Sequence, residues 1–126
     1  MGSVLAAACA VVAPRSSEPA TAPQIDGFGN NAMQVTAQSS VALRQFRQGM
    51  EQVYAFNEHE AVRAFKAAWA TDPSCAMCAW GVALQLGPTL VSPGQSDLSE
   101  ARRHVAAAMR RAAGLPDRER GLIEAL

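Results

Sequence analysis

The residues best suited to chemistry are two cysteines, in the segment Cys75-Ala76-Met77-Cys78. On a helix the two cysteines share a face, and a helix N-terminus lowers the pKa of a thiol by favouring the thiolate. Three interpretations stay open: buried apolar thiols, a reducible disulfide, or half of a metal site. Zinc needs four ligands and the only histidines are His59 and His104, which argues against a metal. Ala79 directly after the pair argues against haem attachment.

The two histidines offer little further chemistry. His59 stands beside Glu58 and Glu60 at the start of an expected helix, and His104 follows Arg103. Both are predicted to be exposed to solvent. The chain has no Gly-rich phosphate loop, no G-x-S-x-G elbow and no H-E-x-x-H pair. We therefore expect no catalytic residue, no bound metal, no cofactor and no enzymatic activity.

Length and charge narrow the class of protein. The chain has 126 residues, of which 49% are hydrophobic, and this suits one small domain. Eleven Lys and Arg balance eleven Asp and Glu, so the formal net charge is zero. Arginines gather toward the C-terminus, but nearby acidic residues nearly cancel them, which is typical of a solvated helix face. The balance predicts no nucleic-acid partner.

The N-terminal region is expected to be separate from the folded part. Val4–Ala13 is an apolar run, much shorter than the about 20 residues of a membrane span. Residues 1–13 resemble a signal segment without its basic start and, through Leu5 to Cys9, loosely a bacterial lipobox. A disordered alanine-rich tail is the alternative, and it would leave the chain in the cytoplasm rather than exported to the periplasm. Residues 14–38, with their prolines, glycines and asparagines, predict a largely irregular linker.

The first two helices are expected on either side of a short turn near Asn57. Residues 40–55 carry apolar side chains at three- and four-residue steps, which indicates one helix. Asn57 and Glu60 have the spacing of a capping box for the second helix, and Asp72-Pro73 would end it. Phe65 and Trp69 are the expected buried anchors of this pair. The predicted stripe of the first helix is Leu43, Phe46, Met50, Val53 and Tyr54.

Three more helices are expected before the last residue. The third runs from after Ser74 to about Leu86 and is apolar nearly all round, as a helix packed between neighbours would be. A loop over residues 88–96 follows it. Asp97 and Glu100 then repeat the capping-box spacing, and the fourth helix ends at Gly114-Leu115-Pro116. The fifth begins at Asp117 and is cut short by the end of the chain. No alternating run indicates a strand, so the predicted fold class is all-α.

Small and aromatic residues in this region recur at repeat spacing. Gly49 precedes Ala61 by twelve residues, and small residues at both places allow two antiparallel helices to approach closely. Phe65 would fill the space between the two helices. Related spacing returns over residues 76–113, which suggests a second unit. The signature residues are Gly49, Ala61, Phe65, Ala68, Pro73 and Trp80.

This spacing resembles the tetratricopeptide repeat (TPR). Tyr54–Ala61 followed by Asp72–Gly81 is similar to a narrower group of bacterial, often exported, TPR proteins of mostly unassigned function. The resemblance covers about residues 36–126 and implies stacked antiparallel helical hairpins, a TPR-like α-solenoid over residues 39–126. It also implies a protein-protein interaction scaffold.

The partner is therefore expected to be a protein or a peptide. Membrane attachment is expected only if Cys9 is lipidated, and self-association through the open helical end is a further expectation. A partner helix or the chain's own Phe28–Val35 segment would fill the apolar groove of the repeats. The alternative function is a thiol-redox or metal-binding helical protein that uses Cys75 and Cys78.

Overall fold

The fold is all-α, as the sequence predicts. The computed structural model describes residues 22–27, 29, 33–88 and 98–126, and within these ranges it contains five α-helices, one 3-10 turn and no β-strand. The elements are α1 (Ser40–Tyr54), α2 (Glu58–Thr71), α3 (Ala76–Leu86), α4 (Leu98–Met109), η1 (Ala112–Gly114) and α5 (Asp117–Glu124).

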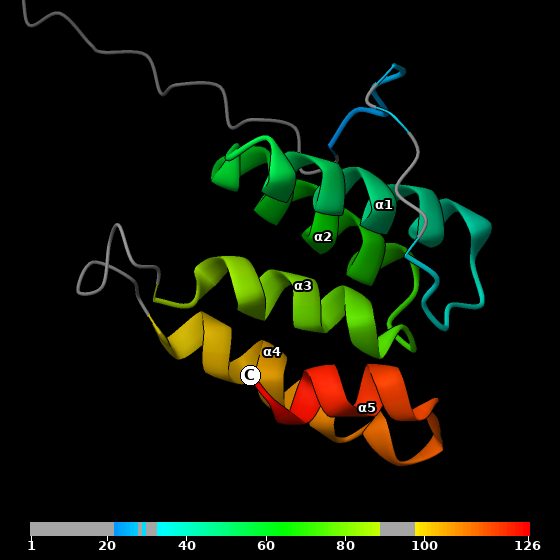
Figure 1. The fold of residues 1–126 in the computed structure, drawn as a ribbon, viewed down its shortest axis with the longest axis vertical. Coiled ribbons are helices and arrows are strands. Elements are labelled where there is room, and N and C mark those ends of the chain that lie inside the picture. Colours follow the sequence, from blue (N-terminus) through cyan, green and yellow to red (C-terminus); the bar gives the residue numbers. More distant parts are fainter. Residues whose placement is uncertain (1–21, 28, 30–32, 89–97) are drawn as a thin grey trace, which may run out of the picture.

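The helices form two hairpins that pack side by side. The most extensive contacts join α1 to α2 and α3 to α4, and α2 packs on α3 between the two hairpins. Figure 1 shows this succession, with α5 lying beside α3 and α4 at the far end. Each hairpin thus buries its apolar side only against the next element, since a single helical pair has no enclosed core of its own.

Phe65 lies at the centre of the contact between α1, α2 and α3. Its side chain has no exposed area, and its ring packs against the Phe46 ring at a centroid distance of 5.5 Å. A Cβ atom at Gly49 would lie 2.6 Å from the Phe65 ring, and one at Gly81 would lie 2.5 Å from it. Both positions therefore need glycine, because the ring fills the space that a side chain would occupy. Gly49 has the close-approach role predicted for it, and Gly81 adds a second.

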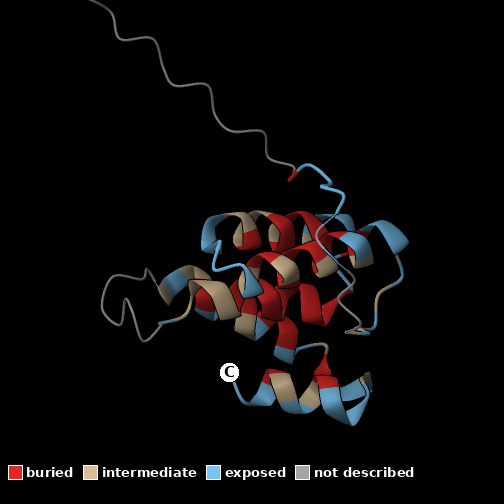
Figure 2. Ribbon diagram, turned by 45° about the horizontal axis from the view of Figure 1, so that its top comes forward, coloured by how far each residue is buried: buried red, intermediate tan, exposed pale blue. Residues whose placement is uncertain are grey.

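Helix α3 is the buried centre of the fold, as its apolar sequence predicts. The eight consecutive residues from Ala76 to Ala83 are buried, and α3 contacts α1, α2, α4 and α5. Figure 2 shows that buried residues concentrate where the helices face one another. Trp80 also donates a hydrogen bond from Nε1 to the Leu122 carbonyl at 2.9 Å, which ties α5 to α3.

The capping interactions between α1 and α2 differ from those that the sequence predicts. Asn57 precedes α2 but its side chain makes no capping hydrogen bond, and Glu60 instead pairs with Arg63 at 2.7 Å. The predicted capping box is therefore wrong. Phe56 has a φ of 57°, and the Asn57 amide donates to the Gln52 carbonyl at 2.9 Å. This Schellman-type turn ends α1 and sets the direction in which the chain enters α2. Asp97, the second predicted cap, lies outside the described residues.

The buried stripe of α1 is more polar than predicted. Phe46 and Met50 are buried, but Tyr54 is 71% exposed, so its predicted place in the core is wrong. Three glutamines, Gln45, Gln48 and Gln52, are buried instead. Gln45 accepts a hydrogen bond from the Thr71 hydroxyl at 2.9 Å. Hydropathy does not reveal this side of α1, because amides are buried only where partners exist to bond them.

Candidate functional site

A segment before α1 follows that helix in an extended conformation. We call residues 33–38 the strap. Burial alternates residue by residue along it, and Met33, Val35 and Ala37 pack against the helical core while the residues between them are exposed. Arg47 donates a hydrogen bond to the Gln34 side chain at 3.3 Å. The strap lies within the predicted linker, residues 14–38, of which the structure describes only a part, and it packs on the helices.

Two buried carboxylates hold the strap through its backbone. Glu119 on α5 accepts from the Thr36 amide at 3.0 Å and from the Thr36 hydroxyl at 2.8 Å. Asp72 at the end of α2 accepts from the amides of Gln38 at 2.6 Å and Ser39 at 3.1 Å. Both carboxylates are at least nine-tenths buried. Residues 33–39 are thus joined to α1, α2 and α5 at once.

An earlier part of the chain also contacts α1. Gln48 donates to the Pro23 carbonyl at 2.7 Å and accepts from the Ile25 amide at 3.0 Å. Ala22 packs against Ala64 and Ala67 on α2. The segment predicted to fill the groove, Phe28–Val35, is described only in part, and its described residues Met33 and Val35 do pack on the core. Phe28 lies outside the described residues.

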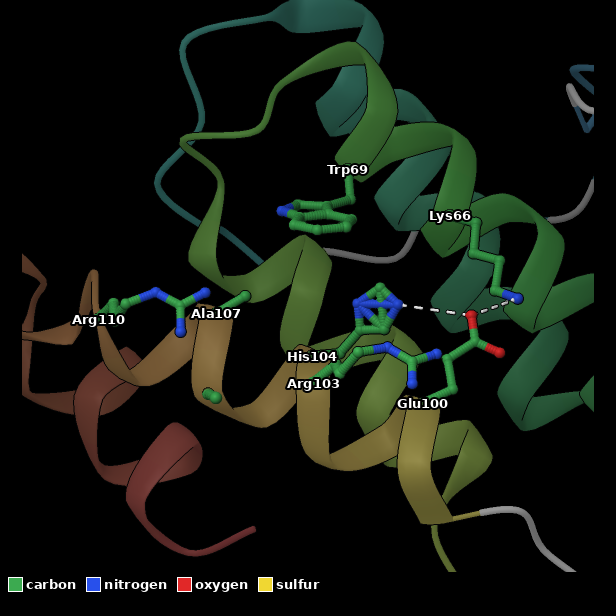
Figure 3. A pocket seen from close by; sticks show the side chains of 8 residues that line it. Lys66, Trp69, Glu100, Arg103, His104, Ala107 and Arg110 are labelled. Carbon is green, nitrogen blue, oxygen red and sulfur yellow. Dashed lines mark ion pairs between the residues drawn. The ribbon is translucent and has the colours of Figure 1, made fainter.

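A pocket of about 590 Å³ lies between α2 and α4 (Figure 3). Lys66 pairs with Glu100 across it at 2.7 Å, and the His104 Nε2 atom lies 3.6 Å from the same carboxylate. The Trp69 and His104 rings meet edge to face with centroids 4.8 Å apart. The charged and aromatic residues that line it are Lys66, Trp69, Glu100, Arg103, His104 and Arg110.

The burial of His104 and of Trp69 differs from what the sequence predicts. His104 was expected in solvent but is only 7% exposed, because the Trp69 ring covers it. Burial lowers the pKa of His104, against the opposing effect of Glu100, so the imidazole is neutral at pH 7. Trp69 is half-buried rather than a core anchor, and its indole nitrogen has no hydrogen-bond partner among the described residues. His59, in contrast, is exposed as predicted.

Cys75 and Cys78 form a disulfide at the start of α3. Both residues have no exposed area, and the Cys75 sulfur accepts from the Cys78 amide at 3.1 Å as the cap of the helix. Of the three interpretations open from the sequence, the structure selects the disulfide. The paired sulfurs are not thiolates, and no group of three or more His, Cys, Asp or Glu in the described ranges could hold a metal ion.

We expect the disulfide to stabilise the fold modestly. It closes a loop of four residues, and chain entropy for so short a loop predicts about 2 kcal/mol. Denaturant unfolding with and without reductant measures this difference. Thiol titration of the unfolded, unreduced chain should detect one of the three cysteines, and reduction should add two. Detection of all three before reduction would contradict the pairing.

Four of the five remaining signature residues lie in one core. Ala61, Phe65, Ala68 and Trp80 belong to the same buried cluster, whereas Pro73 is exposed in the turn between α2 and α3. Sequence reasoning missed the strap, although Met33-Gln34-Val35-Thr36-Ala37-Gln38 alternates apolar and polar residues and this signal was available. It also missed Asp72 and Glu119, since a carboxylate that bonds a distant backbone leaves no local pattern.

In the part of the chain that the structure describes, none of the helices is long and apolar enough to cross a membrane. Comparison with protein-family models, curated proteins and solved structures finds no match to this chain.

Proposed function

We propose that the chain is a protein-binding scaffold of the TPR type, which holds an extended segment of its partner along α1 and α5. The observation that carries this proposal is the strap. Its residues pack on the helices with every second side chain, while Glu119 and Asp72 accept from its backbone. Backbone bonds supply affinity for any extended sequence, and the spaces under alternate side chains supply specificity.

Because the strap already occupies the proposed binding face along α1 and α5, a partner would have to displace it. A segment tethered to its own binding face acts at an effective concentration in the millimolar range, so a partner in trans competes poorly until the strap is weakened. Val35 is the best residue to change, since it is half-buried on the core while its neighbours are exposed.

The test is binding of a labelled peptide with the sequence of residues 33–39 to the full chain. We expect binding to Val35→Asp at least about tenfold tighter than to the unchanged chain, because the tethered competitor is removed. A peptide of the same composition without alternation is the control. Equal binding of both peptides, or no binding to Val35→Asp, would reject the proposed groove.

The disulfide bears on two other expectations, the export of the chain and the thiol-redox alternative. A structural disulfide persists in oxidising compartments, which supports our proposal that the chain is exported. It does not favour the thiol-redox alternative, because disulfide exchange requires an attacking thiolate to reach the sulfur, and both cysteines are fully buried.

A further inference from the structure

The pocket between α2 and α4 has more positive charge than its own carboxylate neutralises. Lys66, Arg103 and Arg110 line it, with Glu100 as the one acidic lining residue. Glu100 is already engaged by Lys66 at 2.7 Å. Among the described residues, no carboxylate lies within 4.0 Å of either arginine guanidinium. Two cations therefore face the pocket with capacity for an anionic ligand.

The spacing of the two arginines defines the ligand further. Arg103 lies on α4, and Arg110 directly follows the last residue of that helix, where its amide still donates to the Ala106 carbonyl at 3.2 Å. The seven-residue step between the two arginines therefore corresponds to two helical turns, about 10 Å along the helix axis. A chain in the polyproline II conformation has three residues per turn and rises about 3.1 Å per residue, so side chains three residues apart lie on the same side, about 9 Å apart. One carboxylate is too small to reach both arginines, but two acidic side chains three residues apart match them.

The aromatic side of the pocket fits the same ligand. Figure 3 shows Trp69 projecting from α2, Arg103 from α4 and Arg110 from just beyond the end of α4, so that a ligand between the helices meets the indole on one side and the guanidinium groups on the other. The indole N–H of Trp69 has no acceptor among the described residues, and a carboxylate or peptide carbonyl is an acceptor. This nitrogen is buried, so the bond would require the ring to turn toward the pocket.

We propose that this pocket binds an acidic segment of a partner protein, with carboxylates three residues apart held by Arg103 and Arg110. A protein segment fits better than a nucleic acid, because the chain has a formal net charge of zero, whereas binding to a phosphate backbone usually depends on an excess of positive charge. None of the residues that line this pocket is among those that bond the strap, so the proposal goes beyond the proposed function and holds independently of it.

The test uses a labelled peptide of sequence Glu-Ala-Ala-Glu-Ala-Ala-Glu and the full chain, with binding followed by fluorescence anisotropy. The same peptide with Gln for Glu is the ligand control. Arg103→Gln/Arg110→Gln is the test variant, and Arg102→Gln/Arg118→Gln removes the same charge from other exposed positions. Circular dichroism verifies that both variants are folded.

We expect the acidic peptide to bind and the Gln peptide not to bind. The test variant should lose about tenfold in affinity or more, because charged hydrogen bonds are lost, and the control variant should lose less than about twofold. An equal loss in both variants would show a non-specific charge effect and overturn the proposal. Tighter binding of oligothymidylate than of the acidic peptide would overturn it in favour of a nucleic acid. Neither result would alter the strap experiment, whose peptide carries no acidic residue.

Discussion

Replacing Phe65 by alanine is expected to lower the free energy of unfolding by about 3–5 kcal/mol, the usual cost of removing a fully buried aromatic side chain. Phe65 has no exposed area and contacts two neighbouring helices, α1 through Phe46 and Gly49 and α3 through Gly81. Its loss would leave a cavity that two facing glycines cannot fill. Denaturant unfolding followed by far-UV circular dichroism measures the change.

The two glycines provide a sharper version of this test. Gly81→Ala should destabilise the fold by about 1–3 kcal/mol, because the new Cβ atom would overlap a ring that Gly49 confines from its other side. Gly121→Ala on α5 is the matched control, since nothing lies within 4 Å of its Cβ position. That change should stabilise by up to about 1 kcal/mol through helix propensity.

A double variant isolates the contact between Gly81 and the Phe65 ring. In the Phe65→Ala background the ring is absent, so Gly81→Ala should no longer destabilise. If Gly81→Ala costs the same in both backgrounds, the close approach of α3 to the Phe65 ring is not what requires glycine there. A stabilising effect of Gly81→Ala in the unchanged chain would contradict the packing directly.

Replacing Asp72 by alanine is expected to lower the free energy of unfolding by about 2–3 kcal/mol. Asp72 is 6% exposed and accepts hydrogen bonds from the backbone of Gln38, Ser39 and Ser74 and from the Ser74 hydroxyl. Its removal leaves several amides without an acceptor and frees the strap at the start of α1. Asp117→Ala is the control, because the Asp117 side chain is 94% exposed and its pair with Arg120 should contribute less than about 0.5 kcal/mol.

Lowering the pH should reduce the contribution of the Asp72 carboxylate to the stability of the fold. Burial alone would raise the pKa of Asp72, but hydrogen bonds from Ser74, Ser39 and Gln38 outweigh it and hold the pKa below its ordinary value of 3.8. The unfolded chain therefore binds this proton first, so the stabilisation is present above pH 3.8 and is lost as the pH falls below it. The stability advantage of the unchanged chain over Asp72→Asn should narrow in that range, and a constant advantage would contradict the assignment.

Helix positions were predictable because their signals are local. The structure begins and ends α1, α2 and α3 within a few residues of the predicted limits, since apolar period, proline and glycine act within one or two turns. The fourth helix was predicted too long: α4 ends at Met109, and residues 112–114 form a 3-10 turn. Gly49 and Phe65 could also be paired from spacing alone, because the hairpin repeat fixes which positions face each other.

The site was less predictable because it is made of groups far apart in the sequence. Glu119 and Thr36 are separated by 83 residues, and neither has a pattern that points to the other. His104 is buried only because Trp69 reaches over it from another helix. Charge and hydropathy assign such residues to solvent by default, since a polar group is buried only where a specific partner exists.

The sequence by itself determined the all-α fold class, the limits of most helices and the close approach of two helices at Gly49. These depend on backbone propensity and on periodicity, which each segment carries within itself. Only the tertiary structure decided that residues 33–38 lie against α1 and α5, that Cys75 and Cys78 are joined, and that Arg103 and Arg110 border a pocket with Trp69. Those outcomes depend on which surfaces meet when the hairpins stack, and no single segment contains that information.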